Sequence, residues 1–306
     1  KGGLADVELL GVIPTPGVAY LVRKYNADAG VVISASHNPM EFNGIKIFAG
    51  TGYKLPDEVE NKIEAYIDNQ CAGLKLATGD DVGRVTCRTD GIKDYADHLY
   101  ESINGDLSGL NVCIDCANGA SAAVARQLFP RLGAKCTFIG VEPDGKNINA
   151  GVGSTHLDNL EKAVIEGGFD CGIAFDGDAD RCLLVDEQGG VIDGDKVLAV
   201  CGSDMKRRGK LSGGTIVATV MSNLGLHEFC RENGVGLVCT SVGDRNVLEK
   251  MNECGYKLGG EQSGHTIFTD YATTGDGQLT ALQFLDVLAR SGKKASELAS
   301  VCPQYP

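Results

Sequence analysis

The chain has 306 residues, of which 43% are apolar, and its formal net charge at pH 7 is −13. A chain of this length can form two or three domains and bury most of the surface that its unfolded state exposes. The acidic balance and the lack of any Lys/Arg run exclude nucleic acid and anionic membranes as expected partners, because both need a basic surface. Since no signal peptide and no apolar stretch of about 18 residues occurs, we expect a cytoplasmic protein.

Apolar runs of strand length alternate with segments of helical period, which is the pattern of an α/β fold. The expected strands are 29–34, 111–115, 135–140, 171–175, 182–185, 215–219, 236–239 and 266–269. The expected helices are 56–69, 90–103, 195–207 and 276–290. In the first of these helices Val59, Ile63, Tyr66 and Ile67 share one face, so we expect that face to be apolar.

Three strand–loop–strand units recur along the chain, at 29–49, 170–186 and 256–270, and a helix follows each. The apolar pattern lapses between 72 and 89 and again around the turn at 187–190. We therefore predict three similar domains, at 1–87, 88–191 and 192–306.

Twelve cysteines are scattered through apolar, strand-like runs. We expect reduced, buried thiols, because a chain of this length needs no disulfide framework. The C-x-x-C from Cys113 to Cys116 has no second pair and no histidine at zinc spacing, which favours core packing over a metal or redox role.

The loop of the second unit reads D-G-D-A-D-R and carries Asp176, Asp178 and Asp180. Small residues between the carboxylates allow their oxygens to converge, and three adjacent negative charges favour a bound divalent cation. The spacing also resembles the start of a calcium loop, although Arg181 stands where that loop requires glycine. The same sequence is compatible with a phosphatase that becomes phosphorylated on Asp176, and with a solvated acidic turn.

The loop of the first unit reads S-A-S-H-N-P, with Ser36 and His37 at its centre and Lys46 on the returning strand. A serine hydroxyl is a weak nucleophile until a base or a cation activates it. A cation held by the Asp loop would supply that activation and would neutralise charge in phosphoryl transfer.

The loop of the third unit reads G-E-Q-S-G-H. Glu261 and Ser263 are suited to binding sugar hydroxyls, and His265 is suited to exchanging a proton near neutral pH. Arg181, in the second loop, either binds a phosphate or neutralises the neighbouring aspartates. Together the three loops suggest metal-assisted phosphoryl transfer on a sugar.

In this order and spacing, the three loops resemble those of the α-D-phosphohexomutase family over essentially the whole chain. Gln262 and the motifs S-V-G-D-R (241–245) and T-T-G-D-G (273–277) are similar to the branch that acts on an amino sugar. The resemblance implies three tandem, similar three-layer α/β/α domains with mixed sheets. It also implies interconversion of glucosamine 6-phosphate and glucosamine 1-phosphate through a phosphoserine enzyme and a bisphosphate, or the corresponding glucose or mannose reaction. The implied cofactor is Mg²⁺, and a homodimer is possible.

The resemblance also assigns roles to individual residues. The implied metal ligands are Asp176, Asp178, Asp180 and phosphorylated Ser36. The implied catalytic residues are Ser36, Lys46, His265 and His37, and the implied substrate contacts are Arg181, Glu261, Ser263 and Arg245. Members of the family usually have a strand ahead of the segment where this chain starts and a fourth, phosphate-gripping domain after the segment where it stops, so we expect this chain to be incomplete at both ends.

Overall fold

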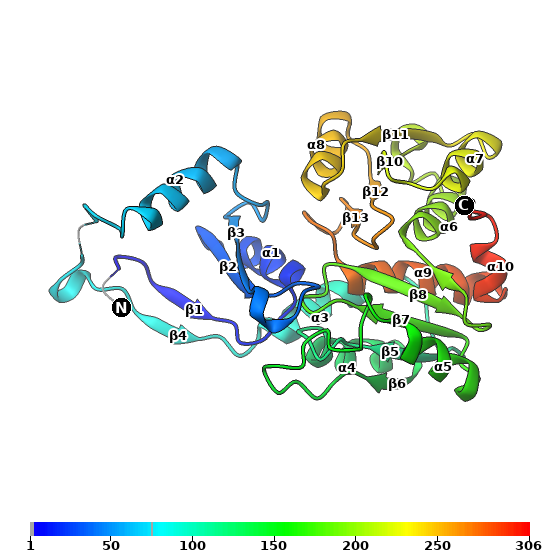
Figure 1. Cartoon of the computed structure of the whole chain (residues 1–306), viewed down its shortest axis with the longest axis horizontal. Helices are drawn as coiled ribbons and strands as arrows, with labels where there is room; N and C mark the ends of the chain where they lie inside the picture. The colour runs from blue at the N-terminus through cyan, green and yellow to red at the C-terminus, as the bar shows by residue number, and fades with distance from the viewer. Residues whose placement is uncertain (1–2, 75) are drawn as a thin grey trace.

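The computed structural model describes residues 3–74 and 76–306. Three α/β units follow one another along the chain, and the N- and C-terminal ends lie at opposite sides of the molecule (Figure 1). One large apolar core runs through all three units. The fold is three α/β/α domains with mixed sheets, as predicted.

The first unit holds two separate two-stranded sheets, in which β2 pairs antiparallel with β3 and β1 pairs parallel with β4. Its elements are β1 (Val7–Leu9), α1 (Thr15–Lys24), β2 (Ala29–Ser34), β3 (Gly44–Ala49), α2 (Asp57–Asp68) and β4 (Val85–Cys87), with short 3₁₀ helices at Met40–Phe42 and Gly79–Asp81. Helix α1 packs so closely on β2 that a Cβ added to Gly30 would lie 2.4 Å from Val22. The β2–β3 register places Ser34 opposite Gly44 and Val32 opposite Lys46.

Helix α2 forms where it was predicted, but its apolar face is not part of the core. None of its residues is buried, and Tyr66 and Ile67 are more than half exposed. The helical period therefore identified the helix correctly, whereas burial of that face depends on what the rest of the unit places against it.

The second unit is built on a five-stranded mixed sheet in the order β6-β5-β7-β8-β9. Its elements are α3 (Gly91–Tyr100), β5 (Asn111–Asp115), α4 (Ala122–Arg131), β6 (Lys135–Ile139), α5 (Asp158–Gly167), β7 (Cys171–Phe175), β8 (Cys182–Asp186) and β9 (Val191–Ile192). All five residues of β7 are buried, which explains its continuous apolar sequence.

The third unit has a four-stranded mixed sheet in the order β11-β10-β12-β13. Its elements are α6 (Gly194–Arg207), a 3₁₀ helix (Ser212–Gly214), β10 (Thr215–Thr219), α7 (Leu224–Glu232), β11 (Gly236–Thr240), α8 (Asp244–Cys254), β12 (Leu258–Gly260), β13 (Thr266–Phe268), α9 (Gly277–Ser291) and α10 (Ala295–Ala299). Side chains of Asp193 and Asp276 cap the N-termini of α6 and α9. Each hairpin is thus followed by a helix, as predicted.

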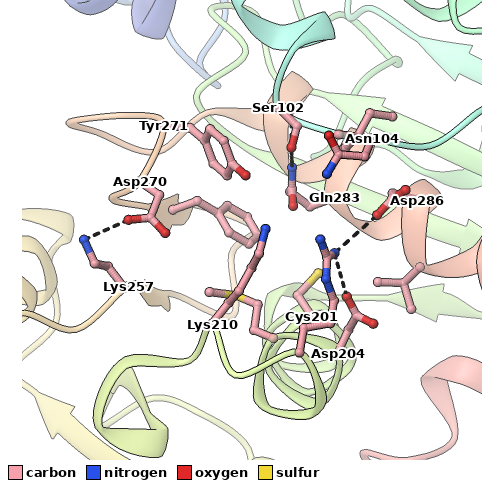
Figure 2. Close-up of a pocket in the computed structure, with 15 residues that line it drawn as sticks. Ser102, Asn104, Cys201, Asp204, Lys210, Lys257, Asp270, Tyr271, Gln283 and Asp286 are labelled. Atoms are coloured by element: carbon pink, nitrogen blue, oxygen red, sulfur yellow. Dashed lines mark hydrogen bonds and ion pairs between the residues drawn. The ribbon is translucent and has the colours of Figure 1, made fainter.

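A small polar cavity of about 30 Å³ lies between α6, α9 and the segment that follows α3 (Figure 2). Arg290 pairs with the buried carboxylates of Asp204 and Asp286, at 2.8 Å from each. Gln283 donates a hydrogen bond to the Ser102 carbonyl at 3.1 Å. The hydrogen bond from Gln283 to Ser102 joins the third unit to the second at a place separate from the three hairpin loops, whereas the Arg290 pairs link α9 to α6 within the third unit.

All twelve cysteines are free, which agrees with the prediction of reduced thiols. Seven are buried, among them Cys113 and Cys116, whose thiol pKa values burial raises to about 11 and about 12. The expectation that all are buried is wrong, because Cys71, Cys87, Cys239 and Cys254 are exposed. Within the described residues, no helix combines the length and apolar character needed to cross a membrane.

Candidate active site

The three hairpin loops meet near the centre of the molecule, although they are far apart in the sequence. The β2–β3, β7–β8 and β12–β13 hairpins each end in one of the polar loops singled out above. Gly177 of the Asp loop packs so closely on the first loop that an added Cβ would lie 2.5 Å from the Ser36 carbonyl oxygen. Directly after the Asp loop, the Cys182 N–H donates to the Gly264 carbonyl of the third loop at 3.0 Å, and His265 of the third loop lies 3.8 Å from Asp180. The Asp loop therefore lies between the other two loops.

Asp176, Asp178 and Asp180 form a buried group of carboxylates at the end of β7. Their exposed fractions are 0%, 2% and 5%, and one oxygen of each lies within 4.8 Å of the others. Ala179, between the second and third aspartates, adopts a left-handed backbone conformation with φ 57°. This turn is what brings the alternating carboxylates together.

The electrostatics of the three carboxylates differ. Burial, and then the charges of Asp180 and Asp178, raise the pKa of Asp176 well above its ordinary value. Burial also raises the pKa of Asp180, but His265 and Lys46 outweigh it and hold that pKa below its ordinary value. The neighbouring protein groups thus neutralise the negative charge of the three carboxylates only in part.

This donor set fits a hard divalent cation. Oδ1 of Asp178 and Oδ1 of Asp180 are buried and have no hydrogen-bond partner among the described residues. Buried carboxylate oxygens without partners are costly unless they coordinate an ion. The three aspartates are therefore the residues that could hold a metal.

Ser36 lies against this carboxylate group. Its Oγ donates to Asp176 Oδ2 at 3.4 Å, and its main-chain N–H donates to Ser34 Oγ at 2.9 Å. Its backbone is left-handed, with φ 53°, which is uncommon for a residue other than glycine. The strained turn points the hydroxyl at the group that could hold a cation.

Lys46 reaches the same group from β3. Its Nζ lies 2.6 Å from Asp178 Oδ2 and 2.9 Å from Asp180 Oδ2. Burial alone would lower the pKa of Lys46, but the two carboxylates outweigh burial and raise it. The side chain is therefore held as an ammonium ion in this structure.

His265 approaches from the third unit and is 4% exposed. The Gly275 N–H donates to Nε2 at 3.1 Å, so Nε2 accepts and the ring proton is placed on Nδ1, which lies 3.8 Å from Asp180 Oδ1. Nε2 also lies 3.5 Å from Asp244 Oδ2, and Asp244 in turn forms an ion pair with Lys54. These contacts fix the ring at the edge of the carboxylate group.

Arg181 and His37 flank the site without joining the carboxylate contacts. Within the described residues, the Arg181 guanidinium forms no ion pair, and only its main-chain N–H contacts the group, donating to Asp176 Oδ1 at 3.2 Å. The Arg181 guanidinium is therefore available to an anion from outside these contacts. Burial, and then the charge of Arg181, lower the pKa of His37, which favours a neutral imidazole.

The remaining predicted substrate residues lie farther out. Glu261 accepts a hydrogen bond from the Gly243 N–H at 3.1 Å, and Ser263 is exposed on the same loop. Arg245 instead contacts the start of α2, pairing with Asp57 and with Glu60, the latter at 3.1 Å. In this structure Arg245 therefore links the third unit to the first rather than lining the carboxylate group.

Three residues of the site were not singled out in the sequence, namely Thr15, Lys54 and Asn149, and Asp244 was noted only as part of the motif S-V-G-D-R. Thr15 and Asn149 contact residues 163 and 113 positions away, and Lys54 and Asp244 are 190 positions apart. The turn-forming sequence I-P-T-P marks the start of α1 but gives no sign of a contact with the Asp loop.

Comparison with known families identifies the same three units. The sequence matches the phosphoglucomutase/phosphomannomutase alpha/beta/alpha domain I over residues 4–72, domain II over 93–190 and domain III over 193–305.

Curated relatives share more than half of their aligned residues with this chain. The phosphoglucosamine mutase of Clostridium tetani is 54% identical over 97% of this chain and 66% of that protein. The phosphoglucosamine mutase of Acetivibrio thermocellus is 56% identical over 99% of this chain and 67% of that protein. The chain thus spans about two thirds of the length of these relatives.

Solved structures show the same fold. A phosphoglucomutase/phosphomannomutase family protein from Burkholderia thailandensis has a TM-score of 0.82 and 25% identity, over 99% of this chain and 66% of that one. The N-acetylphosphoglucosamine mutase of Aspergillus fumigatus, solved with GlcNAc-6P and magnesium, has a TM-score of 0.70 at 17% identity, over 95% of this chain and 77% of that one. With all three domains matched in order and the hairpin loops brought together, the chain belongs to the phosphoglucomutase/phosphomannomutase family, that is, to the α-D-phosphohexomutases.

Proposed function

We propose that this chain provides three domains of a phosphoglucosamine mutase, which interconverts glucosamine 6-phosphate and glucosamine 1-phosphate. The observation that carries the proposal is the Ser36 hydroxyl, 3.4 Å from Asp176 at the edge of a buried group of three carboxylates. The curated relatives that are 54% and 56% identical and bear this name support the choice of substrate.

In this proposal Ser36 carries a phosphoryl group and gives it to a free hydroxyl of the sugar phosphate. The bond from phosphorus to Ser36 Oγ breaks as the bond to the sugar oxygen forms, the proton of that hydroxyl passes to a nearby base, and the leaving Ser36 Oγ takes a proton from a nearby acid. The bisphosphate turns around, and its other phosphoryl group returns to Ser36. Lys46 and His265 are the acid/base candidates, because both reach the carboxylate group beside Ser36.

Asp176, Asp178 and Asp180 would hold Mg²⁺, with the phosphate on Ser36 as a further ligand. The cation would supply neutralisation of the charge on the transferred phosphoryl group. We propose that Glu261 and Ser263 bind sugar hydroxyls and that Arg181 and Arg245 bind substrate phosphate. We also propose that His37 is one of the catalytic residues. Arg245 would have to leave its carboxylate partners on α2 to do so.

We keep the domain division at 1–87, 88–191 and 192–306, a cytoplasmic location and a possible homodimer as proposals. A phosphomannomutase/phosphoglucomutase activity is the nearest competing function, because it belongs to the same family. A phosphatase that uses Asp176 has no support from the family assignment, and Asp176 is fully buried. Strands rather than helices flank the Asp loop, which argues against a calcium-binding module.

The test is phosphopeptide mass spectrometry combined with an activity assay. We expect phosphate on Ser36 that resists hydroxylamine, and loss of turnover in Ser36→Ala with an unchanged fold. In a protein that carries this sequence at the relatives' full length, glucosamine 6-phosphate should be converted faster than glucose 1-phosphate or mannose 1-phosphate, each primed by its bisphosphate. Mg²⁺ should support turnover better than Ca²⁺. Phosphate on Asp176, or full activity of Ser36→Ala, would disprove the proposed mechanism.

A further inference from the structure

Thr15 is the first residue of α1 and belongs to the first unit, yet its polar contacts reach the Asp loop of the second. Its Oγ1 donates to Asp178 Oδ2 at 2.6 Å, and its main-chain N–H donates to the Asp178 carbonyl at 3.0 Å. The residue is 0% exposed. Two bonds from one residue thus fix both the main chain and the carboxylate of Asp178.

The two oxygens of the Asp178 carboxylate have different surroundings. Oδ2 accepts from Thr15 and, at 2.6 Å, from Lys46. Oδ1 is buried and has no hydrogen-bond partner among the described residues. Since a carboxylate rotates as a rigid plane, holding Oδ2 also sets the direction of Oδ1. The free oxygen is then available to a cation.

The local structure around Thr15 makes it a rigid donor. Pro14 and Pro16 restrict the backbone on either side, and a β-branched side chain has few rotamers. Gly17, Val18 and Ala19 continue α1 into the core. A buried threonine hydroxyl commonly bonds within its own helix, as Thr280 does with the Asp276 carbonyl at 2.7 Å. Thr15 instead bonds to a charged group 163 positions away.

We propose that Thr15 is a positioning residue that orients Asp178 for binding a divalent cation and ties the Asp loop to the unit that carries Ser36. The proposal rests on the proposed function only in taking the Asp loop as a cation site. Hydrogen bonds from neighbouring residues commonly orient metal ligands, and removing one typically weakens metal affinity about 10- to 100-fold. Thr15 itself would touch neither cation nor substrate.

The experiment measures Mn²⁺ affinity of the 306-residue chain by electron paramagnetic resonance titration, with Mg²⁺ measured by competition. Thr15→Val keeps the shape and removes the hydroxyl, so we expect binding to weaken about 10-fold or more. Thr15→Ser keeps the hydroxyl and should bind nearly as wild type does. Thr280→Val removes a buried threonine hydroxyl that bonds to the Asp276 carbonyl rather than to the Asp loop, so it should leave affinity unchanged, even if it lowers the melting temperature.

Three results would overturn the proposal: wild-type affinity in Thr15→Val, equal weakening in Thr15→Ser, or equal weakening in Thr280→Val. If Thr15→Val does not fold, as judged by circular dichroism, Thr15→Ala takes its place with the same expected weakening. Wild-type affinity in Thr15→Val would leave the proposed function intact. A wild-type chain that binds no Mn²⁺, or binds it equally well as Asp178→Asn, would overturn both proposals together.

Discussion

The side-chain amide of Asn149 donates hydrogen bonds to the main-chain carbonyl of Ser36 and to that of Asn38, both at 2.8 Å. Asn149 is 5% exposed and has a left-handed backbone, with φ 58°. It belongs to the second unit, whereas the loop that it holds belongs to the first. The turn that presents the Ser36 hydroxyl is therefore supported from outside its own hairpin.

Replacing Asn149 by glycine should loosen this turn. Glycine accepts the left-handed backbone without strain, so the change removes only the side-chain amide. Losing the two hydrogen bonds should cost about 2 kcal/mol. The amide hydrogens of the loop should therefore exchange roughly tenfold faster or more. Hydrogen exchange of the 34–40 segment measures this, with β10 as the internal control. Unchanged exchange of that segment would show that Asn149 does not hold the turn.

Replacing Lys46 by methionine should destabilise the chain when no divalent ion is added. The change leaves Asp178 and Asp180 without the ammonium group that lies within 2.9 Å of both. Breaking a buried ion pair in this way costs about 3 kcal/mol. Urea unfolding with and without Mg²⁺ measures the effect, and saturating Mg²⁺ should reduce it.

The matched control for Lys46 is Lys93→Met, which breaks an exposed pair with Asp97. Such a pair is worth about 0–1 kcal/mol. An equal loss of stability in both variants would mean that Lys46 is not balancing buried charge.

Asp276 should make stability depend on pH between about 4 and 6. Burial is the main cause that raises the pKa of this carboxyl to about 6 from its ordinary 3.8. Well below pH 3.8 it is protonated in both the folded and the unfolded state. As the pH rises towards 6, the unfolded state ionises first, so the folded state loses stability relative to it. A shift of about two pH units corresponds to about 3 kcal/mol.

Asp276→Asn keeps an oxygen that can accept from the Leu279 N–H and so cap α9, and its amide NH₂ can donate to the Tyr95 hydroxyl oxygen, but the side chain cannot ionise. The free energy of unfolding of wild type, minus that of Asp276→Asn, should therefore fall between pH 4 and pH 6 and stay level above. Urea unfolding across this range gives the difference. Parallel curves for the two proteins would contradict the raised pKa.

Arg245→Met should loosen the first turn of α2, because Arg245 pairs with Asp57 and Glu60 and donates to the Leu55 carbonyl at 3.1 Å. Hydrogen exchange of residues 57–62 should rise while Mn²⁺ affinity stays the same. Lys250→Met is the control, since it breaks an exposed pair with Glu253 on α8, the helix that carries Arg245. If α2 exchanges no faster in Arg245→Met than in Lys250→Met, the link between these units is not significant.

The parts that could be predicted from sequence are those that local chemistry determines. The strand on either side of D-G-D-A-D-R is an apolar run, and alternation of small and acidic residues is visible without a fold. Thr15 and Asn149 could not be found in this way, because a threonine between prolines and an asparagine in a loop have common local explanations. The Arg245 contact with α2 was not predicted either, because the family resemblance assigned that side chain to the substrate. Short strands such as β1 and β9 carry too few residues for a periodic signal.

The first unit is joined to its two neighbours by a different balance of contacts. Buried hydrogen bonds from Thr15 and Asn149 join it to the second unit, together with the partly exposed pair of Lys24 and Asp94. Two partly exposed ion pairs, Lys54 with Asp244 and Arg245 with α2, join it to the third unit, together with a buried hydrogen bond from Thr273 to the Gly52 carbonyl. Dissolved ions screen exposed charges strongly and buried contacts little, with a Debye length of about 3 Å at 1 M salt and about 10 Å at 0.1 M. Ionic strength therefore acts on both sides of the first unit, but more strongly on the side that faces the third unit. In concentrated salt we expect the ion pairs between the first and third units to weaken, while Ser36 and the Asp loop stay together.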